Sequence, residues 1–495
     1  MLFFGNFKRY FVHKLIGAEQ LALHEKLDRI VAVVEKLDSI EALQQATGAR
    51  LELVASAILA SPPSSALNDV SIAGLASALR RVRAEQDLAT QIARVTDLDM
   101  TQPARSVIFL HNSYYHFFYL ARALRKRGWR AISVSLEDPN GINAQYYHGE
   151  DVNIHDSDPD QLRANAEALF NFAKRHFNLM HFAGQGHMSF FPANFSTDDP
   201  ADIVEWKKLG KKVAYTISGC KDSTAQSSVH RWAISSTGKS LCDNCVWQDN
   251  PLVCSDADNL AWGKRLHKYC DAIFSEMLPS LDYLSSTHAK VVRSPHTMAN
   301  DEDFWRPDLV IPDAYRLARE VGEVLVYHAV GNYDFRSAGG RNIKGTPAVV
   351  QAIDRLKSEG VRVRLVFFTK VPNTEVRYFQ AQCDIVVDQL WAGSYGATAR
   401  EAMLLGKPVV GFINPFEFDP RDSLEVLQTV PIVNAAVDTI YDVLKDLVLN
   451  ADKRRDIGEK SRAFAVKWHG ARASAAAYES AYDDMLARSR SVEQP

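Results

Sequence analysis

Residues 384–412 read DIVVDQLWAGSYGATAREAMLLGKPVVGF, and this stretch decides the fold. The run from Asp384 to Asp388 is apolar between two acids, which is typical of a buried parallel strand. A glycine-containing turn follows, and Ala397 to Leu405 is rich in strong helix formers. Gly406 suits the end of that helix, and Pro408 begins a second apolar run. The stretch therefore predicts strand, turn, helix and strand, which together form one βαβ unit.

The turn and the helix of this unit also have the features of an anion site. A glycine turn before a helix presents backbone N–H groups and the positive end of the helix to a bound anion. Glu401 lies on the same helix and can accept hydrogen bonds from a ribose diol. These features predict a nucleotide diphosphate site, whose turn is formed by Gly393, Ser394, Tyr395 and Gly396.

This stretch resembles the donor-binding signature of the retaining glycosyltransferases with the GT-B fold. The signature has a Glu, a Gly-aromatic-Gly turn, a second Glu followed by Ala-Met, and Gly-x-Pro-Val-Val. Residues 401–403 and 406–410 match its second half, and residues 395–396 match the turn. The resemblance implies an α/β protein of two Rossmann-like, doubly wound domains that face a cleft. It also implies that the second domain holds a nucleotide sugar and that Glu401 binds the ribose hydroxyls.

One position departs from the signature. Gly393 stands where the first Glu is expected. The preceding Asp388 and Gln389 resemble a branch of the family that carries Asp-Gln-Leu before the turn. They lie at the carboxyl end of a predicted strand, where ligands bind in open α/β sheets. Either side chain could replace the missing Glu, and the alternative is that they only cap the strand and the turn.

Length and composition indicate a soluble globular protein of two or three domains. The chain has 495 residues, of which 46% are hydrophobic and 24% are charged. The net charge of −3 gives no basic field, so we expect no nucleic-acid partner. No apolar run approaches the roughly 20 residues that span a bilayer, and no secretory signal is visible. Six cysteines in so long a chain favour a reducing cytoplasm over a disulfide scaffold.

Strand and helix patterns alternate from Ser106 onward, which is typical of doubly wound sheets. We expect an N-terminal helical extension over residues 1–100 and a first, acceptor-side Rossmann-like domain with a cysteine-containing insertion over residues 101–310. The second, nucleotide-sugar-binding domain is expected over residues 311–470. The resemblance implies that a C-terminal helix, residues 471–495, crosses back to the first domain.

The N-terminal extension carries two further patterns. On a helix, Phe4, Phe7, Phe11 and Leu15 share one stripe, and the segment carries several cations but no acid before Glu19. This pattern predicts an interfacial helix on an anionic membrane, or else an apolar helix packed on another subunit or domain. Residues 20–45 carry about two heptads of apolar seam, which predict a homo-oligomer through a coiled coil. The alternative is one amphipathic helix of a helical hairpin.

A second cluster of candidate residues follows the first strand of the second domain. His328 and Gly331 come at the end of that strand, and Arg341 and Lys344 precede the next helix. When a glycosidic bond to a diphosphate breaks, negative charge grows on the diphosphate. An Arg fork and a Lys ammonium near it stabilise the transition state more than the ground state. The resemblance implies the same role for both cations, and the alternative is a solvated basic turn.

The resemblance also implies a histidine in the first domain, near the reacting sugar. His181 is the candidate that follows from the matching segment, Met-His-Phe-Ala. The nearby His187 and His111 are further, weaker candidates. His111 sits at the end of the first predicted strand, so it could face the cleft. For each of them the alternative is a structural histidine whose ring is satisfied inside the fold.

Four cysteines predict a structural zinc site. Cys242 and Cys245 form a CxxC pair, Cys254 follows, and Cys220 lies upstream. Four thiolates can make a closed tetrahedral Zn²⁺ site, and Cys270 or His230 could replace one ligand. The alternatives are buried free thiols or a redox pair. Such a zinc would hold the insertion and would take no part in catalysis.

Together the residues and the resemblance predict a hexosyltransferase-type enzyme. It would move a sugar from a UDP- or GDP-linked donor to a hydroxyl of a glycan, a lipid-linked acceptor or a protein, with retention of configuration. The resemblance implies no cofactor for catalysis and favours a role in bacterial surface glycan synthesis. We expect a cytoplasmic protein, at the inner face of the membrane if residues 1–18 bind lipid. Two alternatives are a nucleotide-sugar epimerase and a non-catalytic scaffold that binds a nucleotide sugar.

Overall fold

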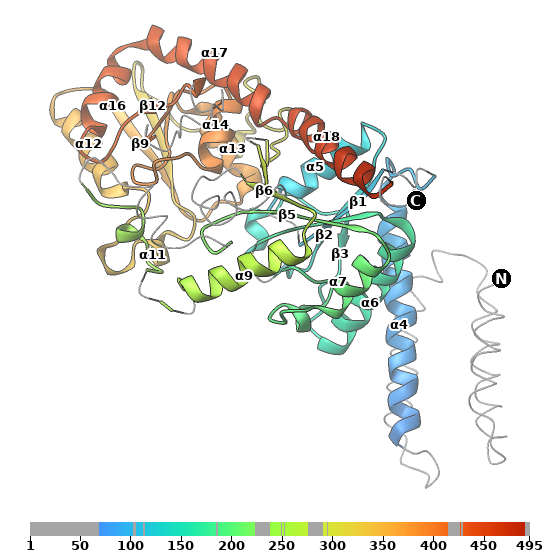
Figure 1. Cartoon of the computed structure of the whole chain (residues 1–495). Helices are drawn as coiled ribbons and strands as arrows, with labels where there is room; N and C mark the ends of the chain where they lie inside the picture. Colours follow the sequence, from blue (N-terminus) through green and yellow to red (C-terminus); the bar gives the residue numbers. More distant parts are fainter. Residues whose placement is uncertain are drawn as a thin grey trace, which may run out of the picture. The chain divides into compact units, whose positions relative to one another are not determined.

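The computed structural model describes residues 69–490, except for 102–104, 112–113, 185–186, 223–237, 249, 252, 276–290, 295, 414–425 and 427–428 (Figure 1). Within this part the chain forms two parallel β-sheets with helices between successive strands. The predicted fold class, α/β with two Rossmann-like doubly wound domains, is therefore confirmed. The N-terminal helix α4 spans Asp69–Ala93. The membrane helix predicted at 1–18 and the oligomerising seam predicted at 20–45 lie outside the described residues.

The first sheet has seven strands in the order β3-β2-β1-β4-β5-β6-β7, and all its pairs are parallel. The strands are β1 (Ser106–Leu110), β2 (Arg130–Ser135), β3 (Val152–Asn153), β4 (Leu179–Ala183), β5 (Lys212–Thr216), β6 (Ala272–Ser275) and β7 (Val291–Arg293). The helices are α5 (His116–Arg125), α6 (Pro159–His176), α7 (Ala201–Lys208) and α9 (Asp256–Tyr269). Strands β1, β2 and β4 are buried along their whole length, because helices cover a parallel sheet on both faces.

The second sheet has five strands in the order β12-β11-β10-β8-β9, again all parallel. The strands are β8 (Val324–Ala329), β9 (Val363–Phe368), β10 (Ile385–Val387), β11 (Val409–Gly411) and β12 (Val433–Asn434). The helices are α11 (Tyr333–Arg336), α12 (Thr346–Ser358), α13 (Asn373–Gln382), α14 (Ala397–Leu404) and α16 (Ile440–Leu449). Strand order reverses between β8 and β10, which makes this pair the switch point of the second domain.

The chain crosses between the two sheets twice, and the two crossings are bonded to each other. Helix α17 (Ala451–Trp468) ends in the second domain, and α18 (Ala471–Arg490) lies beside α5 of the first domain (Figure 1). Between these helices, in the returning crossing, Gly470 pairs with Asn300. Asn300 lies in the forward crossing, which is the segment between β7 and β8. The Asn300 N–H donates to the His469 carbonyl at 2.9 Å, and the Ala471 N–H donates to the Asn300 carbonyl at 2.7 Å. Both crossings thus form one two-stranded connection.

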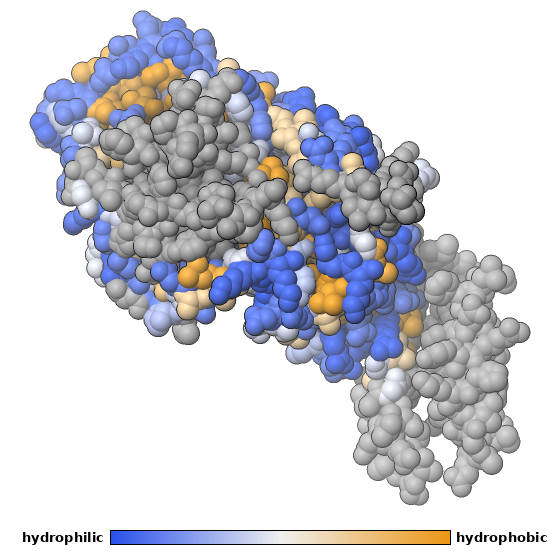
Figure 2. All heavy atoms as spheres, viewed as in Figure 1, coloured by the Kyte–Doolittle hydropathy of each residue, from blue (hydrophilic) through white to orange (hydrophobic). Residues whose placement is uncertain are grey.

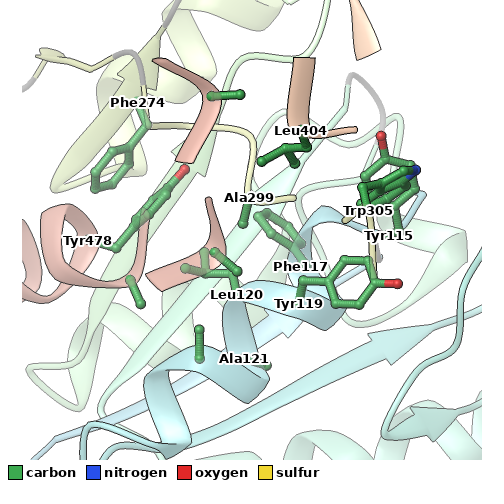
Figure 3. Packing of buried hydrophobic residues seen from close by; sticks show 14 of the residues in the cluster. Tyr115, Phe117, Tyr119, Leu120, Ala121, Phe274, Ala299, Trp305, Leu404 and Tyr478 are labelled. Carbon is green, nitrogen blue, oxygen red and sulfur yellow. The ribbon is translucent and has the colours of Figure 1, made fainter. Parts of the chain in front are cut away.

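An apolar cluster extends from this connection into both domains. It contains Tyr115 and Phe117 from the start of α5, Leu404 from α14 and Tyr478 from α18 (Figure 3). Trp305 of the forward crossing is fully buried among them, with its ring centroid 5.1 Å from that of Tyr115. The forward crossing therefore contributes a large core side chain and joins the two domains through apolar contact.

The described surface is largely polar. Among the residues that Figure 2 colours, most are hydrophilic, and the apolar ones show as small patches. In the part of the chain that the structure describes, no helix combines the length and apolarity that crossing a membrane requires.

Glu302 is expected to contribute strongly to stability, because its buried carboxylate accepts at the start of α18. Its side chain accepts from the Ala471 N–H at 2.7 Å and from the Arg472 guanidinium. Glu302→Ala should lower the free energy of unfolding by about 1–3 kcal/mol, measured by chemical denaturation. The neighbouring Asp303 also contacts Arg472 but is exposed. Asp303→Ala should therefore change the free energy of unfolding by less than about 0.5 kcal/mol. Equal effects of the two variants would contradict this assignment.

Candidate functional site

Two segments of the second domain converge at its switch point. Lys344 lies on the loop between β8 and α12, and Asp388 directly follows β10. Strands β8 and β10 are neighbours, with Val387 paired to His328, so both segments leave the sheet at the same edge. In open parallel sheets this edge, outside the carboxyl ends of the strands, is where ligands bind.

Asp388 is the centre of this arrangement. Its side chain is 1% exposed, and its Oδ1 atom accepts from the Lys344 ammonium at 3.0 Å. Its Oδ2 atom accepts from the Gly396 N–H at 2.8 Å, at the residue that precedes α14. The Lys344 ammonium also donates to the Thr398 hydroxyl, at 3.3 Å, in the first turn of that helix. One carboxylate therefore fixes a cation beside the start of a helix that has no side-chain cap.

The loop that carries Lys344 is held close to β10. Gly345 precedes α12 with a φ of 76°, and a Cβ atom there would lie 3.0 Å from the Leu390 Cβ. The Leu390 N–H donates to the Lys344 carbonyl, at 3.3 Å. The Asn342 side chain accepts from the Thr346 N–H at 2.9 Å, in the first turn of α12. The left-handed backbone and the close contact both require glycine at position 345.

The predicted turn at residues 393–396 is present. Gly393 has a φ of 69°, and the Gln389 amide donates to the Ser394 carbonyl at 2.8 Å. The Gln389 side chain therefore supports the turn by donating to a backbone carbonyl of the turn. The Tyr395 hydroxyl contacts His469 Nε2 at 2.9 Å, which links the turn to the returning crossing.

Glu401, for which the resemblance implies ribose binding, is bonded to side chains of both domains. It is 2% exposed, and its carboxylate accepts from the Tyr115 hydroxyl at 2.8 Å and from Asn373 and Gln380 at 3.3 and 3.2 Å. Burial raises the pKa of Glu401, while these three donors and the nearby Lys344 charge oppose the rise. In this arrangement Glu401 joins α14 to the first domain, and a ribose would have to displace one of its partners.

The other predicted residues of the second domain surround this centre. Arg341 directs its guanidinium to the first domain, where Nη1 donates to the Cys245 carbonyl at 2.8 Å. His328 is fully buried, and its ring nitrogens contact the Val387 carbonyl and the Thr346 hydroxyl, each at 2.9 Å. Burial lowers the pKa of His328 to about 4, so the ring is neutral. Its two contacts hold the end of β8 to β10 and to the start of α12.

Gly331 lies against the first domain. A Cβ atom there would be 3.3 Å from the Tyr146 hydroxyl. The glycine therefore allows a close approach between the loop after β8 and a tyrosine of the opposite domain.

His181 does not lie with these residues. It is fully buried in the first domain, and its ring contacts the Tyr482 hydroxyl through Nδ1 and the Thr216 hydroxyl, at 2.8 Å, through Nε2. Burial lowers its pKa to about 3. In this placement both ring nitrogens are bonded inside the fold, as the structural alternative expects.

His111 and His187, the weaker candidates, lie at the switch point of the first sheet. They follow β1 and β4, which are neighbours where the strand order reverses, and their ring centroids are 5.2 Å apart. His111 is buried with a φ of 58°, a backbone conformation that is uncommon outside glycine. Burial lowers its pKa to about 3, so the ring is neutral near neutral pH.

The cysteines lie apart from the diphosphate candidates, except that the Cys245 carbonyl accepts from Arg341. All four predicted ligands are free thiols. Among the described residues, no group of three or more His, Cys, Asp or Glu side chains is placed so that it could hold a metal ion.

Sequence reasoning missed the partners of the central residues. Thr398, Tyr115, Asn373 and Gln380 were not assigned to the site. Asn373 and Gln380 are seven residues apart and thus on one face of α13, and both donate to Glu401. The seven-residue spacing can be read from the sequence, but the sequence does not show that both side chains face Glu401.

Comparison with known proteins gives the following. No family model matches the sequence. No curated protein matches it either. Among solved structures, a glycosyltransferase from Rickettsia africae is 11% identical over 78% of this chain and 99% of its own, with a TM-score of 0.48. Sucrose-phosphate synthase from Thermosynechococcus elongatus is 13% identical over 78% of this chain and 100% of its own, with a TM-score of 0.47. Anabaena HepE in complex with UDP is 12% identical over 77% of this chain and 100% of its own, with a TM-score of 0.46. At these scores, the similarities carry no argument about activity.

The buried pair of Lys344 and Asp388 should be energetically coupled. We expect a double-mutant cycle of Lys344→Met and Asp388→Asn, measured by chemical denaturation, to give a coupling of about 1–3 kcal/mol. The exposed pair Lys453–Asp446 is the matched control and should give less than about 0.5 kcal/mol. Similar couplings for the two pairs would contradict the role of Asp388.

Glu401 should make stability depend on pH. Its pKa is raised above 4.5 in the folded protein, so its contribution is complete below pH 4.5 and is lost as the pH rises through the folded pKa. Glu401→Gln cannot titrate. The stability of this variant relative to wild type should therefore increase as the pH is raised above 4.5 toward neutral, in denaturation experiments. A difference that stays constant with pH would contradict a raised pKa.

Proposed function

We propose that the chain is a glycosyltransferase that takes a sugar from a nucleotide-diphosphate donor held at the switch point of the second domain. One observation carries the proposal: Asp388 fixes the Lys344 ammonium beside the uncapped start of α14. A cation and helix N-terminal amides at one point are complementary to a diphosphate. The sequence resemblance supports the same assignment, with UDP- or GDP-linked sugars as the donors.

Lys344 would act on the leaving group. An ammonium has three N–H donors, and two of them bond Asp388 and Thr398. The third is then available to a phosphate oxygen without loss of the ion pair. As the glycosidic bond breaks, charge grows on the diphosphate, and a fixed cation stabilises that charge without reorganising. Asp388 is a positioning residue in this proposal, since it holds Lys344 and the start of α14.

The acceptor hydroxyl would approach from the first domain. The hydroxyl of Tyr146 in that domain lies 3.3 Å from where a Cβ of Gly331 would be, so the first domain approaches the loop after β8 closely. The resemblance favours retention, in which the departing diphosphate assists deprotonation of the acceptor. It also favours a glycan, lipid-linked or protein acceptor in bacterial surface glycan synthesis, in the cytoplasm. Arg341 would reach the diphosphate only after releasing the Cys245 carbonyl.

One observation favours a non-catalytic nucleotide-sugar-binding protein as the second candidate. The Glu401 carboxylate is buried and bonded to Tyr115, Asn373 and Gln380. A protein that used the fold only for assembly could retain this link between the domains permanently.

Calorimetric binding of UDP-, GDP-, ADP-, CMP- and dTDP-linked sugars to the full chain tests the proposal. One nucleotide class should bind wild type, and Lys344→Ala should weaken this binding about tenfold or more, because a charge-assisted hydrogen bond contributes about 1.5–3 kcal/mol. Lys453→Ala, an exposed cation on α17, should bind as wild type does. Circular dichroism would show that each variant is folded. If wild type binds none of these donors, or if Lys344→Ala binds unchanged, the donor site is wrong.

If a donor binds, its slow hydrolysis or its transfer to added glycan acceptors separates the two candidates. Turnover supports the transferase. Binding that is never followed by turnover supports the non-catalytic protein.

A further inference from the structure

Three tyrosines gather at the carboxyl edge of the first sheet. Tyr114 follows β1, and Tyr146 and Tyr147 lie after β2, at the end of a short 3₁₀ turn. Strands β1 and β2 are neighbours, so the two segments leave the sheet side by side. The ring centroid of Tyr114 lies 5.8 Å from that of Tyr146 and 5.9 Å from that of Tyr147. We call these three residues the tyrosine cluster.

Tyr114 is the exposed member of the tyrosine cluster. It is 51% exposed, whereas the next residue, Tyr115, is buried. Its φ is 54°, in the left-handed region that bulky residues rarely adopt. Such a conformation persists only where the surrounding structure determines it, and it is found most often at ligand sites. A large aromatic ring is thus presented to solvent at the edge of a parallel sheet where ligands bind.

The tyrosine cluster faces the second domain at two points. Tyr115, the neighbour of Tyr114, donates to the Glu401 carboxylate at 2.8 Å. The Tyr146 hydroxyl lies 3.3 Å from where a Cβ atom of Gly331 would be, on the loop after β8. A molecule that rests on the tyrosine cluster would therefore lie beside the donor site proposed above.

Hydrogen-bonding side chains border the tyrosine cluster. The Glu137 carboxylate, also after β2, accepts from the Tyr147 hydroxyl and from the amide of the exposed Asn143, each at 3.3 Å. A pyranose ring has C–H groups on its faces and hydroxyls around its edge. Aromatic rings are complementary to the faces, and carboxylate and amide groups to the hydroxyls. The acid disfavours a phosphate, and the tyrosine hydroxyls disfavour an acyl chain.

We propose that the tyrosine cluster is a carbohydrate subsite, in which Tyr114 stacks on one pyranose ring while Glu137 and Asn143 bond its hydroxyls. As the place of the acceptor sugar, this subsite rests on the proposed function and narrows the acceptor to a glycan. As a sugar-binding site, it depends only on the tyrosine cluster and its polar border. Tyrosine suits this role because it offers a large, rigid contact area at a small cost in conformational entropy.

Saturation-transfer NMR tests the subsite with no nucleotide present. The probes are the methyl glycosides of glucose, galactose, mannose, N-acetylglucosamine and rhamnose, each added to the full chain. At least one probe should receive saturation from wild type, most strongly at the protons on one face of its ring. Tyr114→Ala should weaken the binding of that probe about fivefold or more, because the aromatic face supplies most of the contact.

Two further variants are the controls. Tyr114→Phe keeps the ring and should bind the probe within about twofold of wild type. Alanine, phenylalanine and tyrosine all carry a Cβ atom, so the left-handed backbone costs a similar amount in each. Tyr441→Ala removes a tyrosine of α16, whose hydroxyl donates to Glu359, and should leave the binding of the probe unchanged. Circular dichroism would show that each variant is folded.

Two results would overturn the proposal. One is a wild type that binds none of the probes, and the other is Tyr114→Ala that binds as well as wild type does. If Tyr114→Ala does not fold, Asn143→Ala takes its place, since Asn143 is exposed. This variant should weaken binding about threefold through the loss of one hydrogen bond, and unchanged binding would likewise overturn the proposal.

Failure here is distinct from failure of the proposed function. Calorimetry with nucleotide sugars reports on the site at Lys344, whereas the methyl glycosides report on the tyrosine cluster. Tyr114→Ala should keep the affinity for a nucleotide sugar within about twofold of wild type, and a general disturbance of the domain boundary would lower both affinities. Glycoside binding in a chain that binds no nucleotide sugar would support the sugar site and refute its role as the acceptor subsite.

Discussion

The carboxylate of Asp388 is the constraint on which the arrangement of the second domain depends. It is buried, and removing a charge from water is costly unless the charge is paired. The Lys344 ammonium and the Gly396 amide satisfy it from two different segments. Because both partners are needed, the loop before α12 and the turn before α14 are fixed to each other at the end of β10. The same requirement leaves a cation at the switch point, and the proposed function follows from that.

The two domains are held by contacts of different kinds. One connection is the pair of crossings around Asn300 and Gly470, with the buried Trp305. A rotation of one domain relative to the other about this connection would preserve its contacts. The bond between Tyr115 and Glu401 spans the domains nearer to the site and has to change if Glu401 is to bind a ligand. Hinges absorb rotation at a few residues while contacts across the cleft exchange. Under the proposed function, a ligand bound by Glu401 would replace this hydrogen bond and so remove one contact between the domains.

The sequence predicted the regular elements of the second domain well and the tertiary partners poorly. The strand, turn, helix and strand predicted over residues 384–412 are β10, the turn at 393–396, α14 and β11, because apolar runs and glycines mark their ends. Helix α9 was not predicted, although Ser255 caps it through the Asp258 N–H. His181 was assigned to catalysis by resemblance alone. Its burial depends on Tyr482, about three hundred residues away, and no local pattern reports such contacts.

The most direct test of the central claim is a crystal structure of the chain with the nucleoside diphosphate that it binds best. The diphosphate should lie at the carboxyl edge of β8 and β10, within hydrogen-bond distance of the Lys344 ammonium and the first amides of α14, with the pair of Lys344 and Asp388 intact. A diphosphate bound elsewhere, with Lys344 still bonded only to Asp388 and Thr398, would show that the proposed donor site is wrong.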